Sequence, residues 1–428
     1  MRQVFNLILV HLFFPIALMA QENPSTVTKK TSEYDAFEKF RFGGYGEMAA
    51  SYMDYGFNRL TPTGSSKMDR GTISIPRFIL AIDYKFSSSW ILGAEIEFEY
   101  GGTGVAREIE WYTEGGEWET EIEKGGEVAL EQFHITKLIH PSFNVRAGHI
   151  IVPIGLTNAH HEPINFFGVY RPEGETIILP STWHENGISF FGEVGAFNYE
   201  VMMVAGLDPL GFRNTEWIAS GQQKMYEVNS FTSPAFAGRL DYNGIKGLRV
   251  GISGYYNQSA KNASKPGKTA GMKNTVNIIT GDVQYKNRNL IARGNIVYGT
   301  LGDSEALSAE KRKLSGSSGY PRTDVGSRAV SYGGEIGYNI GSFFGKNALR
   351  IFSFVRYEYY NPMERTQGKV LADKRMETAM WSVGANYYAL PNLVVKADYT
   401  HRQIGDGDYN SENMLSVGLA YIGWFFSK

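Results

Sequence analysis

Apolar and polar residues alternate along most of this chain with a period of two. Between residues 90 and 101, Leu92, Ala94, Ile96 and Phe98 occupy one face, while three glutamates occupy the other. Such alternation is typical of β-strands whose two faces meet different surroundings. Because ionised carboxylates are costly to place in an apolar medium, the glutamate face must meet water, and the other face can meet lipid.

The alternation recurs from Arg41 to the end of the chain, and it predicts a series of strands joined as hairpins. The fourth and sixth predicted strands are the least regular, because their alternation slips. We predict sixteen strands, at 41–52, 72–86, 90–101, 127–139, 142–150, 187–194, 196–206, 235–243, 247–258, 274–286, 289–300, 328–341, 347–361, 376–389, 391–403 and 413–426.

The connections between these strands are alternately short and long. Short links include 87–89, 140–141 and 287–288. Outer-membrane barrels have this arrangement, with short turns on the periplasmic side and long loops outside. The long connections cover 53–71, 102–126, 151–186, 207–234, 259–273, 301–327, 362–375 and 404–412.

The strand lengths also fit a membrane barrel. Ten residues that rise about 3.3 Å each, tilted by about 40°, span about 25 Å, the height of the apolar band of outer-membrane barrels. A soluble sandwich gives no reason for connection lengths to segregate. Tyr332, Tyr338, Trp381 and Tyr387 lie near opposite strand ends, as interfacial girdles require. The chain is therefore predicted to be all-β, a transmembrane antiparallel β-barrel of sixteen strands with long extracellular loops.

The first twenty residues have the pattern of a signal peptide. Arg2 supplies a positive charge, Val4 to Ala20 is largely apolar, and the polar run that starts at Gln21 follows a small residue. An uncleaved membrane anchor is the alternative, but the apolar span is short for a bilayer crossing. We expect a signal peptide at 1–20, a short periplasmic segment at 21–40 and the barrel at 41–428, in the cell outer membrane.

The charge balance excludes one class of partner. Lysine and arginine total 42 residues against 44 for aspartate and glutamate, so no basic excess supports binding to nucleic acid. The chain has no cysteine, which excludes disulfides and thiolate metal sites. Small hydrophilic solutes and membrane lipid are the expected partners.

The polar strand faces predict which residues line the barrel. Sixteen strands enclose too wide a space for side chains to fill, so the lumen is expected to hold water. The alternative for any single residue is pairing with a neighbouring strand, which would merely keep the wall rigid. The basic residues expected to line the pore or set its selectivity are Arg77, Lys85, Arg146, Arg239, Arg249, Arg293, Arg350, Arg356, Lys396 and Arg402, together with Arg171 in the third long loop. Acidic residues expected on the same face include Glu95, Glu97, Asp83, Asp241, Asp282, Glu335, Glu358 and Asp398.

The third long loop, 151–186, is unusually apolar for a surface segment. Folding it into the barrel mouth would bury its apolar side chains and narrow the channel. In that position Arg171, Glu173 and Glu175 are expected to face the permeating solute.

Four histidines lie in or beside this loop, at 149, 160, 161 and 184. No ligand spacing of the HxxH or HExxH type accompanies them, so we expect neither a metal site nor a cofactor. The sequence also lacks a phosphate-binding GxxxxGK[ST] loop and a GxSxG elbow, and no enzymatic activity is expected. A hydrolase with a rim serine or aspartate beside a loop histidine is the minority alternative.

Four segments resemble the phosphate-selective porin O and P family, especially its forms in Bacteroidetes. They are FRFGGYGEM at 40–48, RAGHIIVPIGLTNAHHEP at 146–163, FFGVYRPEGETIILPSTWHENG at 166–187 and YIGWFF at 421–426. The resemblance implies a homotrimer of sixteen-stranded barrels with an inward-folded third loop, and an anion or phosphate channel. The chain departs from the usual terminal aromatic, since Ser427 and Lys428 follow Phe426.

Taken together, these features predict an outer-membrane porin for ion transport, with a water-filled channel for passive diffusion of small polar or anionic solutes, phosphate among them. The alternative is a barrel that serves mainly as an adhesin or a structural envelope protein, with the long loops as its binding surface.

Overall fold

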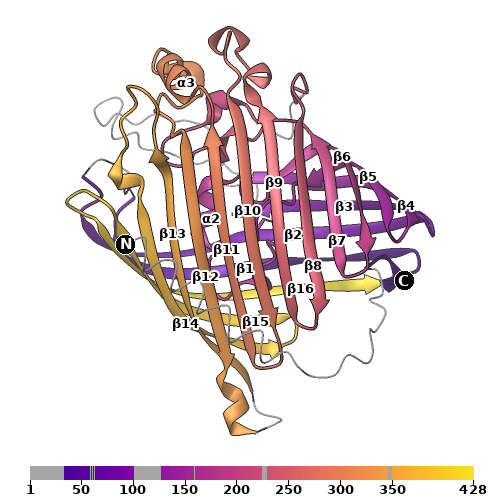
Figure 1. Cartoon of the computed structure of the whole chain (residues 1–428). Coiled ribbons are helices and arrows are strands. Elements are labelled where there is room, and N and C mark those ends of the chain that lie inside the picture. Colours follow the sequence, from indigo (N-terminus) through magenta and orange to yellow (C-terminus); the bar gives the residue numbers. More distant parts are fainter. Residues whose placement is uncertain are drawn as a thin grey trace.

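The computed structural model describes residues 33–57, 59, 61, 63–100, 127–158, 160–223, 229–345 and 349–428. These residues form a closed barrel of sixteen antiparallel strands (Figure 1). The predicted number and order of strands are confirmed. The strands are β1 (Phe40–Tyr55), β2 (Lys67–Ser87), β3 (Trp90–Glu99), β4 (Glu127–His140), β5 (Phe143–Ile151), β6 (His184–Val194), β7 (Phe197–Val204), β8 (Ala235–Ile245), β9 (Leu248–Gln258), β10 (Thr275–Lys286), β11 (Leu290–Leu301), β12 (Arg328–Asn339), β13 (Arg350–Arg365), β14 (Thr378–Leu390), β15 (Leu393–Ile404) and β16 (Ser411–Ser427).

The barrel closes between its first and last strands. β1 pairs with β16 from Arg41 opposite Ser427 to Met53 opposite Met414, and every other strand pairs with its neighbours in sequence. Closure leaves no strand edge with unpaired amide and carbonyl groups, which a membrane-spanning sheet requires.

A β-bulge explains why the fourth strand is irregular in sequence. Glu95 pairs with Gln132 and Ile96 pairs with Leu130, so Glu131 is the extra residue on β4. The bulge moves the inward positions of β4 by one residue, and the side chain of Glu131 is fully buried. The sixth strand starts at His184, three positions before the predicted residue 187.

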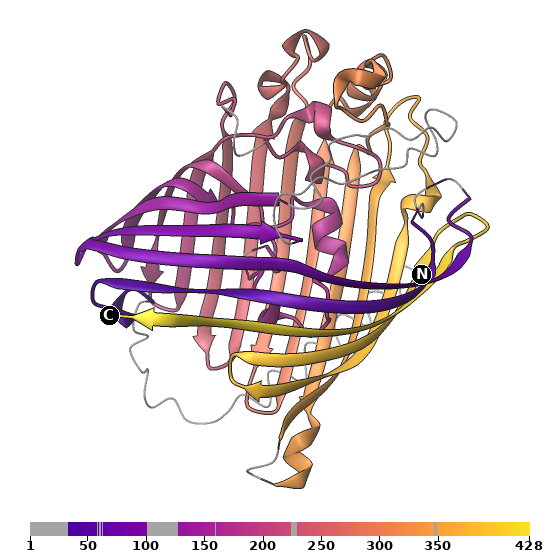
Figure 2. The ribbon, with the colours of Figure 1, turned by 180° about the vertical axis from the view of Figure 1, so that it is seen from behind.

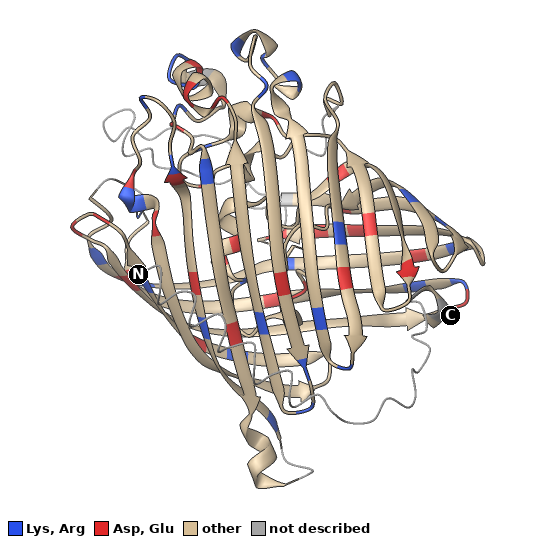
Figure 3. Ribbon diagram, in the orientation of Figure 1, with Lys and Arg blue, Asp and Glu red and all other residues tan. Residues whose placement is uncertain are grey.

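The two strand faces differ as predicted. Ile279, Ile296, Leu415 and Val417 are each about half exposed on the outside, while charged residues on the alternate positions are buried inside. Figure 3 shows blue and red bands at intervals along the strands, separated by uncharged positions. An apolar outer face and a charged lumenal face are the arrangement of a barrel in lipid.

Aromatic side chains gather on the outer face at two levels. The ring of Tyr332 stacks on Tyr359 with centroids 4.9 Å apart, and Tyr357 contacts Trp381 at 4.5 Å. Farther along β12, Tyr338 stacks on Phe343 at 5.6 Å. These contacts confirm that the aromatic residues lie at different heights, as interfacial girdles do.

The connections segregate to the two ends of the barrel. The helix α3 and other long loops stand at the top of Figure 1, and tight turns join β8 to β9 and β10 to β11 at the bottom. The helical segments are η1 (Glu33–Ala36), η2 (Pro163–Asn165), α2 (Glu173–Ile178), η3 (Pro209–Gly211), η4 (Ala219–Gly221), η5 (Ser259–Asn262), η6 (Pro266–Lys268), α3 (Ser304–Lys311), η7 (Gly316–Ser318), η8 (Ile340–Phe344) and η9 (Lys374–Met376). Among the residues described, none of these helices has the length and apolar character needed to cross a membrane.

The described chain starts with a short segment that is packed against the barrel. Tyr34 and Phe37 are buried against Ile91 at the start of β3. The last residue, Lys428, accepts hydrogen bonds from the amides of residues 38–40 and donates one to the Phe40 carbonyl. The predicted signal peptide, 1–20, and residues 21–32 of the predicted periplasmic segment lie outside the described residues.

Candidate functional site

The third long loop lies inside the barrel, as its apolar composition predicts. It runs from the end of β5 to β6 and carries η2 and α2, and Figure 2 shows it crossing the interior. The side chains of Ile154, Phe167 and Ile178 are fully buried, and Phe167 stacks on Phe354 of β13 at 5.2 Å. Burial of such side chains stabilises the inward position by about 1.5–3 kcal/mol each.

Lys396 anchors the backbone of this loop. Its ammonium group donates to the carbonyl oxygens of Pro163, Phe166 and Gly168, at 2.5, 2.9 and 2.9 Å. The side chain of Lys396 is only 2% exposed. The residue lies on the lumenal face, as predicted, but all three of its donors point at the loop.

Carboxylates of strands β12, β13 and β15 accept hydrogen bonds from backbone amides of the loop. Asp398 accepts from the Val169 amide at 2.5 Å, and Glu335 accepts from the Phe167 amide at 3.2 Å. Glu358 accepts from the amide of Gly174 at 2.9 Å. The wall thus supplies partners for the backbone of an irregular segment, which would otherwise leave polar groups buried and unpaired.

Four of the predicted pore-lining arginines also contact the loop. Arg239 donates to the Gly155 carbonyl at 2.8 Å, and Arg77 donates to the His161 carbonyl at 3.1 Å. Arg356 donates to the carbonyl of residue 170 at 3.5 Å, and Arg402 forms an ion pair with a loop glutamate.

The remaining predicted strand residues also lie on the lumenal face, where each has a partner. Arg249 pairs with Asp282 at 3.3 Å, and Arg293 pairs with Glu335. The other three contact aromatic or backbone groups: Arg350 lies 4.6 Å from the ring of Tyr388, Lys85 donates to the Phe37 carbonyl, and Arg146 donates to the Tyr34 hydroxyl at 3.0 Å.

The loop residues that we expected to face the solute all have partners within the protein. Glu175 is 2% exposed and accepts from the amides of residues 156–158 at 2.8–2.9 Å, so it shapes the loop from within. Burial raises the pKa of Glu175, against these hydrogen bonds. Arg171 donates to Ser181 and Thr182, both at 2.8 Å. The expectation for Glu175 was therefore wrong, because its carboxylate is needed to bind three loop amides.

Glu173 is held by charge. Burial alone would raise its pKa, but Arg402 and Arg59 lower the pKa to about 2. The Tyr360 hydroxyl also donates to this carboxylate, at 2.6 Å. Glu173 therefore ties α2 to the wall as a carboxylate.

A cavity of about 620 Å³ lies in the lumen beside the loop. Its charged wall contains three arginines and five carboxylates, and each arginine is paired within the wall: Arg41 with Asp83 at 2.6 Å, Arg146 with Glu200 at 3.7 Å, and Arg239 with Asp241 at 2.7 Å. The other two carboxylates are Glu95 and Glu162.

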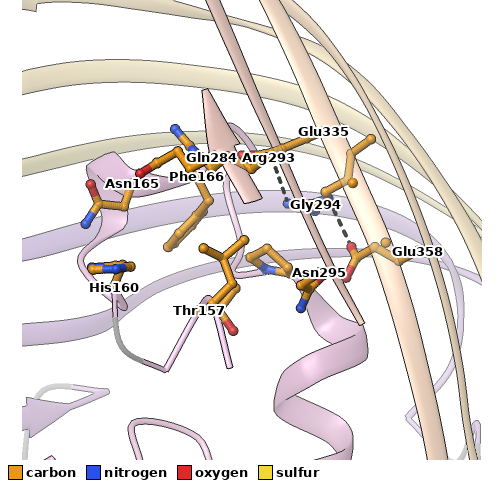
Figure 4. Close-up of a pocket in the computed structure, with 15 residues that line it drawn as sticks. Thr157, His160, Asn165, Phe166, Gln284, Arg293, Gly294, Asn295, Glu335 and Glu358 are labelled. Carbon is orange, nitrogen blue, oxygen red and sulfur yellow. Dashed lines mark hydrogen bonds and ion pairs between the residues drawn. The ribbon is translucent and has the colours of Figure 1, made fainter. Parts of the chain in front are cut away.

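A second cavity, of about 30 Å³, lies between the loop and strands β10 to β13 (Figure 4). His160 and Phe166 of the loop face Arg293 and Glu335 of the wall across it. The space is enough for a water molecule. His160 also lines the larger cavity, and burial, with Arg249 nearby, lowers its pKa well below the usual value.

Two of the histidines in this region contact each other, and a third contacts a glutamate. His149 and His184 are in contact at 2.5 Å, and His149 also contacts Asn186 at 2.8 Å. His161 instead lies 2.9 Å from the buried carboxylate of Glu131.

Glu95 from β3 joins Glu131 and His161, and their potential ligand atoms all lie within 4.8 Å of one another. The Tyr45 hydroxyl donates to Glu131 at 3.2 Å. The sequence pattern does not reveal this group, because its members come from β1, β3, β4 and the third loop. The only hint in the sequence is the slipped alternation around Glu131.

The closed barrel, its apolar outer face and its inward third loop define a multi-pass β-barrel of the outer membrane, with the fold of the porins. No family model matches the chain. An uncharacterized protein of Aquifex aeolicus (strain VF5) is 26% identical over 405 residues, which cover 92% of this chain and 81% of that protein.

Solved structures of outer-membrane porins and channels share the fold. An anion-selective porin from Comamonas acidovorans superposes with a TM-score of 0.52 at 11% identity, covering 90% of this chain and 99% of that one. OmpF of Salmonella typhi, in complex with daunomycin, gives 0.55 at 11% identity and covers 91% and 99%. The channel DcaP of Acinetobacter baumannii gives 0.50 at 12% identity and covers 90% and 97%.

Proposed function

We propose that this chain forms a water-filled channel through which small polar solutes diffuse passively across the outer membrane. The observation that carries the proposal is the 620 Å³ lumenal cavity, whose wall is lined by charged side chains beside the inward loop. Ionised groups in such a wall need water, and a hydrated passage through lipid is a channel.

The hydrogen bonds between the third loop and the barrel wall support a fixed constriction. Lys396, Arg239 and Arg77 donate to its carbonyls, and carboxylates of β12, β13 and β15 accept from its amides. These buried charges are therefore used to hold the loop. A constriction held in this way sets a size limit on solutes without a moving gate.

The resemblance of the sequence to phosphate-selective porins makes anions, including phosphate, the finer candidate. The wall of the cavity favours only weak charge selectivity, since each of its three arginines is paired with a carboxylate. Within the described part of the chain, Glu95 and Glu162 lack an arginine or lysine at ion-pair distance, so the local field favours cations slightly.

The geometry gives no support to hydrolytic chemistry in the loop region. Among the described residues, the imidazole rings of His149, His161 and His184 contact asparagine, glutamine, glutamate, tyrosine and one another, rather than a serine hydroxyl. A nucleophile needs a base within hydrogen-bond reach. We therefore propose that the channel is not an enzyme.

Two further parts of the proposal rest on the sequence. Residues 1–20 would direct export and be removed after Ala20. The resemblance to porins implies a homotrimer, which sedimentation in detergent would test.

The decisive measurement is the single-channel conductance of the purified, refolded protein in a planar bilayer, with reversal potentials under a salt gradient. We expect steady conductance and a reversal potential near zero, or slightly toward cation selectivity. A reversal potential that shows clear anion selectivity, and that is abolished by added phosphate, would support a phosphate-selective channel instead. If verified barrels did not conduct, the proposal of a diffusion channel would fail.

A further inference from the structure

Three side chains from separate elements converge at one point of the lumenal wall. Glu95 lies on β3, Glu131 is the bulged residue of β4, and His161 belongs to the third loop. His161 Nε2 lies 2.9 Å from Glu131 Oε1. Two ligands bound at about 2.1 Å on a tetrahedral ion lie about 3.4 Å apart, so a shift of about 0.5 Å would open this ion pair to the spacing of two metal ligands.

The hydrogen bond on the other side of the imidazole supports a cation between these atoms. His161 Nδ1 lies 3.1 Å from the carbonyl oxygen of Asn158, which can only accept, so Nδ1 carries the hydrogen. In the neutral ring Nε2 then presents a lone pair to the Glu131 carboxylate. Two lone pairs at this distance need a positive charge between them, either a proton or a metal ion. A backbone carbonyl on the far nitrogen is also the usual orienting partner of a metal-bound histidine.

A surplus of buried carboxylate points the same way. Glu97 is 6% exposed, and its Oε1 has no hydrogen-bond partner among the described residues. The same holds for Oε2 of Glu95, two positions away on the same face of β3. Of the two arginines near this group, Arg77 forms its ion pair with Glu47 at 3.0 Å, and Arg171 donates to Ser181 and Thr182. Like charges gathered in a buried site are costly unless a counter-charge joins them.

The group can be reached from the lumen. Tyr45, Glu95 and His161 all line the 620 Å³ cavity, so an ion and its water ligands can approach from that side. Glu131, which is fully buried, would be the inner ligand. A site with protein ligands on one side and water on the other is open in the manner of an exchangeable metal site.

We propose that Glu95, Glu131 and His161 bind one divalent transition-metal ion of the zinc class. One imidazole nitrogen and two carboxylates suit Zn²⁺ and its neighbours, whereas Mg²⁺ and Ca²⁺ prefer all-oxygen sites. The ion links the third loop to strands β3 and β4, and Glu97 and the Tyr45 hydroxyl lie around it as supporting groups.

This inference goes beyond the proposed channel function and does not depend on it, because binding is measured on the refolded barrel without a bilayer. The protein would be stripped with a chelator, dialysed, and titrated calorimetrically with zinc chloride. We expect one Zn²⁺ per chain, and we expect a large excess of Mg²⁺ not to displace it.

Two variants test the ligands. His161→Gln and Glu95→Gln should each weaken zinc binding by more than about tenfold. The matched controls are His149→Gln, which removes an imidazole from the His149–His184 pair, and Glu193→Gln, which removes an exposed carboxylate. Both controls should bind within about threefold of the parent protein, and circular dichroism and gel migration of unheated samples would verify that every barrel is folded.

The competing outcomes are clear-cut. Loss of binding in His149→Gln with retention in His161→Gln would place the ion at the other histidine pair and overturn the proposal. Folded barrels that bind no zinc, or that bind magnesium equally well, would overturn it too.

Discussion

The ammonium nitrogen of Lys396 lies 2.5 Å from the carbonyl oxygen of Pro163, although 233 positions separate the two residues in sequence. A lysine in the wall of a water-filled barrel would normally face water. This one is buried, and it holds three carbonyls of the loop that narrows the lumen.

Replacing Lys396 should therefore loosen the constriction. In Lys396→Met the loop carbonyls lose their donors, at a cost of about 1–3 kcal/mol for a buried polar group left unpaired. We expect larger and noisier single-channel currents, and faster proteolysis of the loop. Lys286→Met, at the exposed end of β10, is the control and should leave both unchanged. Unaltered currents in Lys396→Met would show that the loop is held by its apolar contacts instead.

The Glu173 contact predicts sensitivity to acid. Its folded pKa of about 2 lies below the usual value near 4.5, so its contribution to stability is full above pH about 4.5 and is lost as the pH falls toward 2. At neutral pH the contribution is up to about 3 kcal/mol. Urea unfolding in detergent should show this loss below pH 4, and Glu173→Gln should flatten that part of the profile. Equal acid profiles for the two proteins would contradict the assignment.

Lys311 predicts a response in the opposite pH range. The residue is fully buried at the end of α3, outside the strands, and burial, with Arg213 nearby, lowers its pKa to about 7. The unfolded chain then binds more protons than the folded one between pH 7 and about 10, so the free energy of unfolding rises with pH in that window. Thermal unfolding should show this rise, and Lys311→Met should abolish it and stabilise the protein at pH 6.

Substitutions in the Arg239–Asp241 ion pair should shift the charge selectivity of the channel in opposite directions. Arg239→Gln removes a positive charge beside Asp241 and Asp282, so the reversal potential should move toward cation selectivity. Asp241→Asn should move it toward anions. The measurement is the reversal potential in a tenfold salt gradient, with chelator present. If both variants shifted it in the same direction, the lumenal field would not govern permeation.

Alternation determined most of the fold, because in a two-faced strand each residue's surroundings follow from its parity. It placed Arg293 and Lys396 on the lumenal face correctly. It could not show that Lys396 binds carbonyls of the third loop, since parity fixes the face of a side chain but not its partner across the lumen.

The group around Glu131 shows the other limit. A β-bulge breaks the rule of parity at that residue, and a pattern based on parity records only a disturbance. Its neighbours His161 and Glu95 come from segments with no fixed spacing to it, so no local motif exists to find. Glu175 was misplaced for a related reason: three of its partners are amides of its own loop, whose conformation the pattern does not describe, and a fourth is Asn295 of β11.

The hydrogen bonds between Lys428 and the start of β1 carry a consequence for biogenesis. The seam between β1 and β16 joins the first and last strands in sequence, so it can form only after all the intervening strands exist. Pairing of segments so distant in sequence is slow, and until the seam forms β1 and β16 each leave amide and carbonyl groups unpaired along one edge. Because the start of β1 and Lys428 meet there, a circular permutant of residues 38–428 that joins these two points by a short linker and opens at an exposed turn should retain the barrel, with its last closing step moved to a different pair of strands.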